Sequence, residues 1–408
     1  MKCRHCGSPL DLVLIDLGAQ PPSNAYLTPD ALRAPERWYP LRVLVCEHCW
    51  LVQTEDFTRA EELFSPDYAY FSGFSTSWLA HCKRFVEEAS QRFGLGPESY
   101  VVEVAANDGY LLQYVQAHGI PCLGIEPTAS TAAAARTKGI AIVQDFFGVR
   151  LAQTLVSEGK QADLMIANNV LAHVPDINDF VGGFSILLKP RGVATFEFPH
   201  LLRLIVEAQF DTIYHEHFSY LSLTAVERIF SSVGLIVFDV EELPTHGGSL
   251  RVYAQRADTG TYPRSIRVDA MLEKERAAGL MDSATYSGFQ ARAERIKDDF
   301  LGFLLTAKRE GKRVAAYGAA AKGNTLLNFA GVKPDLLPFV VDRNPAKQGK
   351  YLPGSRIPIV GEQKLEATRP DYIVILPWNL REEIMAQLVY ARSWGARFVT
   401  AVPKLEVV

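Results

Sequence analysis

The stretch Tyr100-Val-Val-Glu-Val-Ala-Ala-Asn-Asp-Gly-Tyr-Leu-Leu112 predicts a buried strand, a tight turn and the start of an amphipathic helix. Gly109 stands at the bend, and Asn107 and Asp108 are residue types that cap helices. Glu103 lies near the end of the strand. A unit of this kind opens the doubly wound sheets that bind cofactors, so this stretch decides the fold class of the middle of the chain.

Strand patterns alternate with helical patterns after this unit. Further strands are expected in the stretches 121–127, 140–143, 163–175 and 192–198. Residues 235–240 and 250–254 are expected to add an antiparallel hairpin at the sheet edge, joined through Thr245-His-Gly-Gly-Ser249. The Gly-Gly turn either closes a plain hairpin or approaches a ligand. Alternating strands and helices therefore predict a doubly wound α/β sheet.

A second unit of strand, turn and helix runs from Arg313 to Thr325 and repeats the pattern of residues 101–112. Residues 266–310 before it are charged and helix-periodic, and strands are expected after it at 337–341, 372–376 and 398–402. The predicted fold class is α/β, with a small cysteine-containing N-terminal domain, the doubly wound sheet, and a C-terminal Rossmann-like domain.

The first turn lacks the Gly-x-Gly-x-x-Gly pattern that lets backbone amides meet a pyrophosphate. It has Gly109 alone, and Glu103 faces the site, so it repels phosphate and suits a cationic ligand. S-adenosylmethionine fits, because it carries an ammonium and a sulfonium and no phosphate. Glu126, at the end of the second strand, is placed to accept the hydroxyls of its ribose.

Other residues are expected around the same cofactor. Asp145 and Phe146 follow the third strand and are candidates for adenine, while Asn168 follows the fourth. Tyr68 and Ser72, in a segment rich in tyrosine ahead of a helix, either form a flap over the cofactor or pack in the core.

Two Cys-x-x-Cys pairs lie near the N-terminus, and they consist of Cys3, Cys6, Cys46 and Cys49. Four thiolates leave no open coordination position, so the pairs predict a structural zinc rather than a redox dithiol or an unmetallated knuckle. His5 and His48 lie inside the knuckles, where they either replace a cysteine or are solvated.

Composition excludes several classes of protein. The 408 residues carry a formal charge of −4 and are 48% hydrophobic, which gives no basic excess for nucleic acid and enough apolar residues for two or three cores. No apolar run approaches the ~20 residues that span a bilayer, and the start Met1-Lys-Cys-Arg lacks the apolar core of a secretory signal. We expect a cytoplasmic protein without nucleic-acid or membrane partners.

The stretch Tyr214-His215-Glu216-His217 brings two imidazoles, a carboxylate and a phenol together, so we predict it to be the chemical centre. Asn169 and His173 follow the fourth strand, and His173 is either a core histidine or a donor to substrate. His200 precedes the helix that leads to the centre and is a further candidate for substrate binding.

The second turn is small and carries Lys322 where the first turn is acidic, which favours an anion at the helix N-terminus. Asn324, Arg343 and Lys347 are the further candidates here, and Trp378 adds an aromatic wall. A nucleoside diphosphate is the expected guest, and a solvated charged loop is the alternative.

These motifs occur in one order: the cysteine pairs, Asn-Asp-Gly, Glu-Phe-Pro-His, Tyr-His-Glu-His-Phe-Ser-Tyr, and Tyr-Gly-Ala-x-x-Lys-Gly-Asn. The series resembles the nucleotide-sugar C-methyltransferases of deoxysugar biosynthesis, which methylate a ring carbon next to a 4-keto group. Ala106 departs from the small polar residue that the family often has there. The resemblance implies a zinc domain at 1–67, a class I methyltransferase domain at 68–265 that binds S-adenosylmethionine, and a helical connection with a nucleotide-sugar domain at 266–408.

The resemblance also implies roles at the centre. His217 would be the base at C-3 of a dTDP-linked 4-keto-6-deoxy sugar, with Glu216 orienting it or binding the sugar. Tyr214 would hold the C-4 oxygen, helped by His215 or Asn169. The alternatives are methylation of an oxygen or nitrogen on another small molecule, a catalytic metal on the His-x-His pair, and a non-catalytic scaffold that binds a nucleotide.

Overall fold

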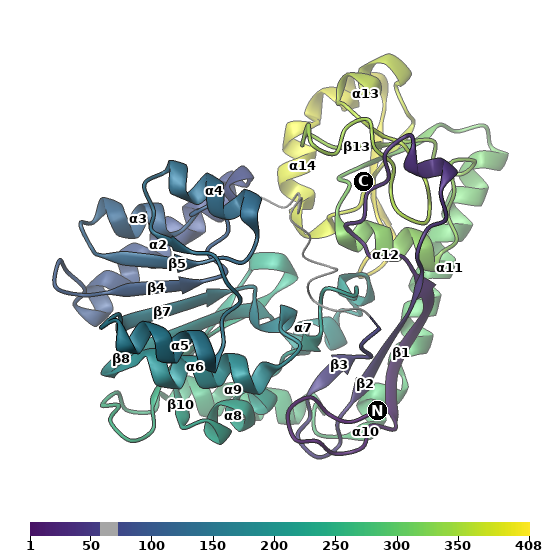
Figure 1. The fold of residues 1–408 in the computed structure, drawn as a ribbon. Coiled ribbons are helices and arrows are strands. Elements are labelled where there is room, and N and C mark those ends of the chain that lie inside the picture. The colour runs from purple at the N-terminus through teal and green to yellow at the C-terminus, as the bar shows by residue number, and fades with distance from the viewer. Residues whose placement is uncertain (58–71) are drawn as a thin grey trace.

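The computed structural model describes residues 1–57 and 72–408. Their strands form three sheets of four, seven and six strands, and helices cover the two larger sheets (Figure 1). The mixed α/β fold class expected from the sequence is confirmed. Within the described ranges, no helix is long and apolar enough to cross a membrane.

The seven-stranded sheet has the strand order β10-β11-β8-β7-β4-β5-β6. Its strands are β4 (Val101–Val104), β5 (Cys122–Ile125), β6 (Ile142–Val143), β7 (Ala162–Asn168), β8 (Leu188–Pro199), β10 (Leu235–Leu243) and β11 (Ser249–Arg256). Strands β4 to β8 are parallel, whereas β11 is antiparallel to both β8 and β10. The predicted hairpin is therefore present, with its second strand inserted beside β8.

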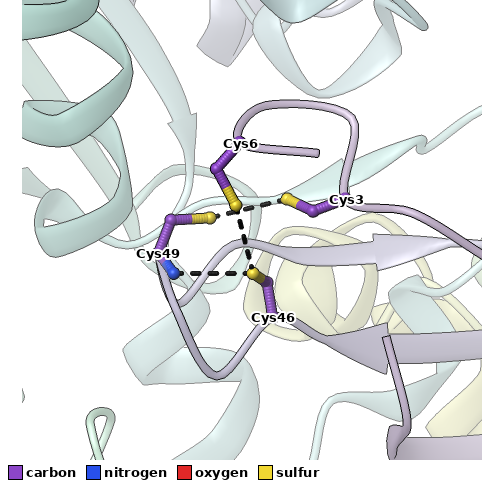
Figure 2. Close-up of side chains that lie close together, drawn as sticks. All are labelled: Cys3, Cys6, Cys46 and Cys49. Atoms are coloured by element: carbon purple, nitrogen blue, oxygen red, sulfur yellow. Dashed lines mark hydrogen bonds between the residues drawn. The ribbon is translucent and has the colours of Figure 1, made fainter. Parts of the chain in front are cut away.

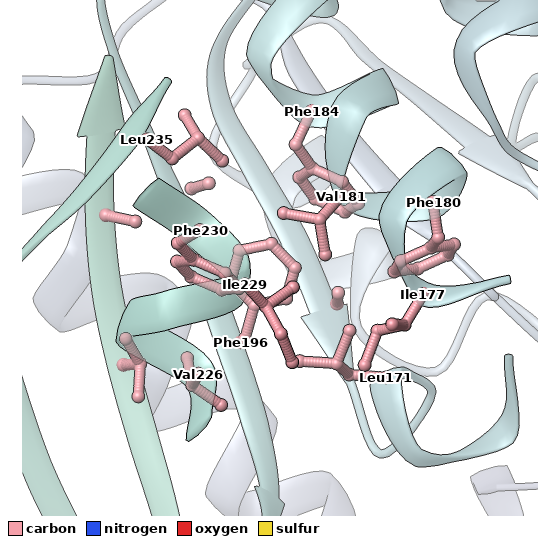
Figure 3. Close-up of a cluster of buried hydrophobic side chains, with 14 of the residues drawn as sticks. Leu171, Ile177, Phe180, Val181, Phe184, Phe196, Val226, Ile229, Phe230 and Leu235 are labelled. Carbon is pink, nitrogen blue, oxygen red and sulfur yellow. The ribbon is translucent and has the colours of Figure 1, made fainter. Parts of the chain in front are cut away.

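Helices pack on both faces of this sheet through their buried apolar residues. They are α2 (Thr76–Phe93), α3 (Leu112–Ala117), α4 (Ala129–Thr137), α5 (Val149–Ser157), α6 (Ile177–Leu187), α8 (Leu223–Ser232) and α9 (Ile266–Ala277). Helix α7 (Leu201–Val206) shares a separate core with Leu14 and Val43. Figure 3 shows the core under α6 and α8, where the rings of Phe184 and Phe230 lie 4.5 and 4.7 Å from the ring of Phe196 on β8. This packing holds the carboxyl ends of the parallel strands at one edge.

The four-stranded sheet joins residues 12–54 to residues 219–220, which lie far apart in the sequence. Its order is β1-β2-β3-β9, with β1 (Leu12–Gln20), β2 (Tyr39–Val45), β3 (Val52–Thr54) and β9 (Ser219–Tyr220). Strand β9 immediately follows the Tyr214 to His217 stretch and pairs with β3. The predicted chemical centre is thus anchored in the N-terminal sheet.

The six-stranded sheet has the order β14-β13-β12-β15-β16-β17, with β17 antiparallel to β16. Its strands are β12 (Val314–Tyr317), β13 (Val340–Val341), β14 (Ile359–Val360), β15 (Tyr372–Ile375), β16 (Arg397–Thr400) and β17 (Glu406–Val407). The helices of this part are α10 (Ser283–Ser287), α11 (Phe289–Arg309), α12 (Ala321–Phe329), α13 (Gln363–Thr368) and α14 (Arg381–Gln387). Strand β12 leads into α12 through the second predicted turn.

Short 3-10 helices supply most of the residues at the sheet edges. They are η1 (Ala31–Arg33), η2 (Ser72–Phe74), η3 (Leu171–His173), η4 (Phe210–Thr212), η5 (Thr245–Gly247), η6 (Trp378–Leu380) and η7 (Val389–Trp394). Helices η3, η4 and η5 follow the ends of β7, α7 and β10, and η6 follows β15. Contacts between η5 and η6 join the seven-stranded and six-stranded sheets.

One buried carboxylate ties three helices together. Glu275 of α9 accepts hydrogen bonds from the backbone N–H groups of Leu223 and Thr224, at 2.6 and 2.8 Å, and from the Thr224 hydroxyl at 2.7 Å. Its Oε1 also lies 2.6 Å from His200 Nε2, at the start of α7. A carboxylate at the N-terminus of α8 satisfies N–H groups that the helix cannot pair itself.

Replacing this carboxylate should therefore destabilise the protein. We expect Glu275→Ala to lower the free energy of unfolding by about 3–5 kcal/mol, because it leaves buried donors and the His200 ring without their partner. Glu275→Gln, which keeps one acceptor oxygen, should lose less. Denaturant unfolding followed by circular dichroism measures both changes, and a loss below ~1 kcal/mol for Glu275→Ala would show that the pair contributes little.

Candidate active site and metal centre

The four predicted cysteine ligands meet at one end of the N-terminal sheet (Figure 2). All four Sγ atoms lie within 4.8 Å of one another, with 3.5 Å between Cys3 and Cys49 and between Cys6 and Cys46. Zinc bound tetrahedrally at ~2.3 Å from each sulfur separates the sulfurs by about 3.8 Å. The cluster therefore fits a zinc ion with no open coordination position, as a structural site requires.

Local turns explain how the sulfurs converge. The N–H of Gly7 donates to the carbonyl of Cys3 at 3.0 Å, and the N–H of Trp50 donates to the carbonyl of Cys46 at 2.7 Å. The side-chain amide of Gln53 donates to Cys3 Sγ at 3.3 Å, which favours a thiolate.

The two knuckle histidines do not join the sulfurs. His5 Nδ1 lies 2.8 Å from Asn178 Oδ1, and the carbonyl of His48 accepts a hydrogen bond from Arg228. The group of possible ligands at this end, within the described residues, consists of the four cysteines.

Metal removal should therefore unfold the N-terminal sheet. We expect one zinc per chain by elemental analysis, and we expect a strong chelator or Cys46→Ser to remove it and to lower the melting temperature, because zinc binding contributes to folding. Cys122→Ser, a lone cysteine on β5, serves as the matched control and should keep the zinc. A purified protein with no zinc and full stability would favour the unmetallated alternative.

The predicted cofactor residues lie at the carboxyl edge of the seven-stranded sheet. The turn after β4 is left-handed at Ala105, Asn107 and Gly109, with φ of 59°, 49° and 75°. A Cβ on Gly109 would lie 2.3 Å from the Cδ1 atom of Ile140, so this position admits only glycine. The N–H of Asn107 donates to Glu126 Oε2 at 2.9 Å, which fixes the carboxylate expected to meet a ribose.

Several buried acceptors at this edge have no hydrogen-bond partner of normal geometry among the residues that the structure describes. The Glu103 carboxylate is buried beside the Tyr110 phenol, and neither of its oxygens makes a hydrogen bond of normal geometry with a described residue. Burial raises the pKa of Glu103 well above its ordinary value. Asp108 Oδ1 and Asn168 Oδ1 are likewise buried and unpartnered among the described residues. Such atoms call for a ligand that donates hydrogen bonds, and the ammonium and hydroxyls of S-adenosylmethionine are donors.

Segments on both sides of the turn complete this edge. The N–H of Ser72 donates to Asn107 Oδ1 at 2.9 Å, so η2 closes on the turn. Asp145 pairs with Arg150 at 2.7 Å, and Phe146 beside it is 46% exposed, which leaves its ring accessible. Tyr68 lies outside the described residues.

His217 has the geometry of a base. Its Nδ1 lies 3.0 Å from the carbonyl oxygen of Thr212, and because a carbonyl can only accept, Nδ1 carries the proton and Nε2 has the lone pair. Its ring centroid lies 4.0 Å from that of Tyr214 and 4.7 Å from that of His173. Burial, with smaller effects from His173, His246 and Lys322, lowers the pKa of His217 well below its ordinary value, although the Thr212 carbonyl acts to raise it. The imidazole is therefore neutral at pH 7.

The side chains next to His217 point in different directions. Glu216 is buried, and its Oε1 accepts a hydrogen bond from Asn24 Nδ2 at 3.1 Å. His173 Nδ1 donates to the carbonyl of Glu216 at 2.7 Å, and burial lowers the pKa of His173 to about 4. His215 instead turns towards the N-terminal sheet, where its Nε2 lies 3.2 Å from the carbonyl of Pro40.

Two predicted substrate residues have other partners. His200 pairs with Glu275, and its side chain is 1% exposed, so it does not reach the His217 group. The side chain of Asn324 is buried and donates to the carbonyl of Ser23 at 2.6 Å. Both residues join elements of the fold in this structure.

The predicted cations surround the second turn. Lys322 Nζ lies 4.7 Å from the ring of Trp378 and donates to Asn379 Oδ1 at 2.6 Å. Lys347 Nζ donates to the carbonyl of Ala319 at 2.7 Å, and Arg343 is exposed. Three basic side chains thus lie around the end of β12 and the start of α12, together with the Asp342 carboxylate, which accepts the N–H of Ala319 at 2.8 Å and lies 3.8 Å from Lys347 Nζ.

Sequence reasoning missed two residues of the site. Asp211, three positions before the Tyr214 to His217 stretch, accepts a hydrogen bond from Trp378 Nε1 at 2.7 Å. Burial raises its pKa to about 6, although Lys322 and Trp378 act to lower it. His246, in the turn where only the glycines drew attention, has its Nε2 3.1 Å from Asn169 Nδ2. Both residues lie next to motifs that the sequence singled out, and this position could have identified them as candidates.

Comparisons with known proteins agree with this geometry. Three family models match in order: a zinc binding domain at residues 3–64, a methyltransferase domain at 78–240, and a C-methyltransferase C-terminal domain at 244–403. The C-methyltransferase NovU of Streptomyces niveus is 33% identical over 407 residues, which cover 100% of this chain and 96% of NovU.

Solved structures resemble part of the chain. Magnesium protoporphyrin IX methyltransferase from Synechocystis PCC 6803 with bound S-adenosylmethionine is 15% identical, with a TM-score of 0.33, over 44% of this chain and 81% of that one. The PH0226 protein from Pyrococcus horikoshii OT3 is 15% identical, with a TM-score of 0.38, over 49% and 100%.

The full-length relative and the three domain models agree with the four-cysteine cluster. They also agree with the buried hydrogen-bond acceptors at the carboxyl edge of the seven-stranded sheet, which suit S-adenosylmethionine. Zinc is a structural component of the protein, and S-adenosylmethionine is its methyl donor. The chain belongs to the family of S-adenosylmethionine-dependent C-methyltransferases that carry an N-terminal zinc-binding domain.

Proposed function

We propose that the protein deprotonates C-3 of a dTDP-linked 4-keto-6-deoxy sugar and methylates the carbon of the resulting enolate. The observation that carries this proposal is the buried, neutral His217, whose Nδ1 is held by the carbonyl of Thr212 at 3.0 Å. Methylation of an oxygen or nitrogen would not require a carbon base. The sugar itself comes from the resemblance of the ordered motifs to nucleotide-sugar C-methyltransferases.

The base and its neighbours have separate tasks. A carbon next to a ketone loses its proton at a useful rate only when a base is aimed at it and the developing enolate oxygen is stabilised. His217 Nε2 would take the C-3 proton. Tyr214, whose ring lies 4.0 Å from that of His217, would donate its phenol to the C-4 oxygen. S-adenosylmethionine supplies the electrophilic methyl group when it is bound.

Glu216 and His173 would orient the sugar around this base. The second carboxylate oxygen of Glu216 is buried and has no hydrogen-bond partner among the described residues. It can therefore accept a hydrogen bond from a sugar hydroxyl or amine. Holding both reactants in one orientation would supply much of the rate.

The nucleotide would bind at the C-terminal sheet. Lys322, Arg343 and Lys347 place positive charge around the N-terminus of α12, where backbone N–H groups also favour an anion. Trp378 offers a ring beside them. The diphosphate would lie here, with the sugar extending towards His217. Because zinc-binding thiolates persist in a reducing compartment, we place this enzyme in the cytoplasm.

Replacing the base should abolish methyl transfer. We expect mass spectrometry of the protein with S-adenosylmethionine and a panel of dTDP-4-keto-6-deoxy sugars to show one methyl group added to a sugar carbon. His217→Asn should lower the rate by roughly 10²–10⁴-fold, the usual contribution of a general base, while binding both ligands as tightly as the wild type.

Two outcomes of this assay would contradict the proposal. Transfer to an oxygen or nitrogen of the acceptor would favour the other class of methyltransferase. Carbon methylation at an undiminished rate in His217→Asn would move the base to another residue. His118→Asn, a change on the C-terminal cap of α3, is the matched control for histidine replacement.

The pH dependence of kcat/KM should show the lowered pKa of His217. A base whose pKa is lowered stays unprotonated as the pH falls, so kcat/KM should stay level through pH 6.5 and fall only below it. His173, with a pKa of about 4, stays neutral at pH 6.5, and Asp211, with a pKa of about 6, titrates below that pH. An acid limb centred at or above pH 6.5 would contradict the assignment.

A further inference from the structure

Two residues in left-handed backbone meet at the edge of the seven-stranded sheet. Asn169 follows β7 with φ of 54°, and His246 lies in η5 with φ of 55°. Residues other than glycine are uncommon in this region, although Asn and His enter it more readily than most. The two side chains nevertheless meet, with Asn169 Nδ2 3.1 Å from His246 Nε2.

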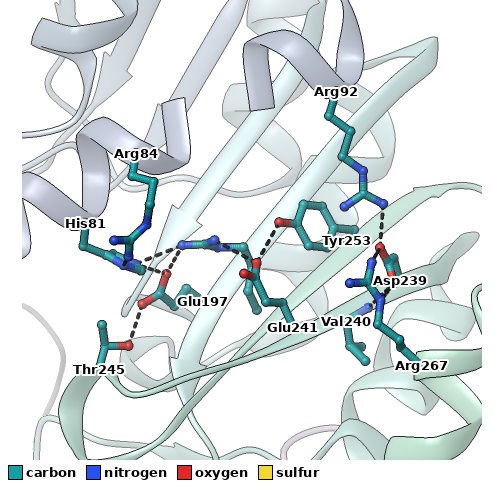
Figure 4. Close-up of polar contacts among 11 residues, drawn as sticks. His81, Arg84, Arg92, Glu197, Asp239, Val240, Glu241, Thr245, Tyr253 and Arg267 are labelled. Atoms are coloured by element: carbon teal, nitrogen blue, oxygen red, sulfur yellow. Dashed lines mark hydrogen bonds and ion pairs between the residues drawn. The ribbon is translucent and has the colours of Figure 1, made fainter. Parts of the chain in front are cut away.

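One buried glutamate holds both backbones. The carbonyl of Glu197, on β8, accepts the N–H of Asn169 at 2.7 Å, and its carboxylate Oε1 accepts the Thr245 hydroxyl at 2.9 Å (Figure 4). Thr245 directly precedes His246. The main chain of Glu197 thus fixes one partner, and its side chain fixes the other.

The glutamate is itself tightly held. Its Oε2 lies 2.8 Å from His81 Nε2 and 2.6 Å from the Arg251 guanidinium, and the guanidinium packs 4.3 Å from the ring of Phe85. Burial acts to raise the pKa of Glu197, but His81 and Arg251 outweigh it and hold the pKa at about 2. The carboxylate is therefore a constant anchor over the pH range in which the enzyme is studied.

The turn that contains His246 also packs against residues of other elements. The ring of His246 lies 5.3 Å from that of Trp78 on α2. A Cβ on Gly247 would lie 2.4 Å from the ring of Trp378, so the turn abuts the C-terminal part of the chain. These contacts leave the imidazole little freedom to change its orientation.

We propose that His246 is a positioning residue that turns the Asn169 side chain so that its Oδ1 accepts a hydrogen bond from a hydroxyl or amino group of the methyl acceptor. An amide nitrogen can only donate, so His246 Nε2 accepts and the amide has one orientation. Asn169 Oδ1 is then left buried, with no hydrogen-bond partner in the described ranges. An acceptor so placed is satisfied when a donor on the substrate reaches it.

The inference rests on the proposed function for its substrate, but the hydrogen bond itself does not. A purely structural His246 would fill space against Trp78, and a ring of similar shape would replace it. A positioning His246 needs an acceptor at the place of Nε2. The two roles therefore predict different outcomes for His246→Phe and His246→Gln.

Methyl transfer distinguishes the two roles. We expect His246→Phe to lower kcat/KM at least ~10-fold, the value of one hydrogen bond of ~1.4 kcal/mol. His246→Gln, whose Oε1 can accept from Asn169, should recover most of that loss. Asn169→Ala should match His246→Phe, and the double variant should be within about twofold of either one because the residues act as a unit. S-adenosylmethionine affinity should stay unchanged in all four variants.

Two further variants test the hydrogen bond between the Thr245 hydroxyl and Glu197. Thr245→Val removes the hydroxyl that Glu197 holds and should lower kcat/KM in the same direction, whereas Thr245→Ser keeps it and should retain activity. Wild-type kcat/KM in His246→Phe, or additive losses in the double variant, would overturn the positioning role. Equal rates for Thr245→Val and Thr245→Ser would overturn the anchoring by Glu197.

A measurement without substrate separates this inference from the proposed function. Nitrogen-15 spectra of histidine-labelled protein should show His246 protonated at Nδ1 and unprotonated at Nε2, and Asn169→Ala should shift the Nε2 signal. An Nε2-protonated His246, or no shift in Asn169→Ala, would overturn the inference. If the wild type methylates no sugar but these spectra are as expected, the proposed substrate fails while the hydrogen bond stands.

Discussion

Under the proposed mechanism, the chemistry of this protein depends on the hydrogen bond between His217 Nδ1 and the carbonyl of Thr212. It fixes the tautomer, and burial keeps the ring neutral, so a basic lone pair exists at Nε2 at neutral pH. Keeping that geometry requires rigid backbone on both sides of the ring. The loop begins at η4, which packs on α12 of the C-terminal part, and it ends in β9, which pairs with β3 of the N-terminal sheet. The zinc cluster stabilises that sheet, so under the proposed mechanism it also contributes to the position of the base.

Charge is distributed unevenly between the two predicted ligand sites. Glu103, Asp108 and Glu126 lie around the turn after β4, where carboxyl groups favour a ligand that carries a sulfonium and an ammonium. Lys322, Arg343 and Lys347 lie around the corresponding turn after β12, where an anion is favoured. The two units share the pattern of strand, turn and helix, and carboxylates dominate the first turn whereas cations dominate the second, where Asp342 lies 3.8 Å from Lys347. Under the proposed function, this difference would give each ligand one site.

Local sequence patterns predicted the elements and the metal ligands well. Apolar runs such as 101–104 and 162–168 form buried strands wherever they occur, and paired cysteines have few other uses in a reducing compartment. The directions of individual side chains could not be predicted in this way. His215 and His217 are two positions apart, yet one faces Pro40 and the other faces Thr212. The side chain of Asn324 donates a hydrogen bond to the carbonyl of Ser23, about 300 residues away in the sequence. His246 contacts Asn169 across two turns that both bond to Glu197.

In the proposed function, His217 removes a proton from carbon before any methyl group moves. The most direct test is to incubate the protein with a dTDP-4-keto-6-deoxy sugar in deuterium oxide, with S-adenosylhomocysteine in place of the methyl donor, and to follow C-3 by nuclear magnetic resonance. The wild type should exchange the C-3 proton for deuterium, and His217→Asn should not. Equal exchange in the variant, or methyl transfer by a wild type that never exchanges this proton, would contradict it.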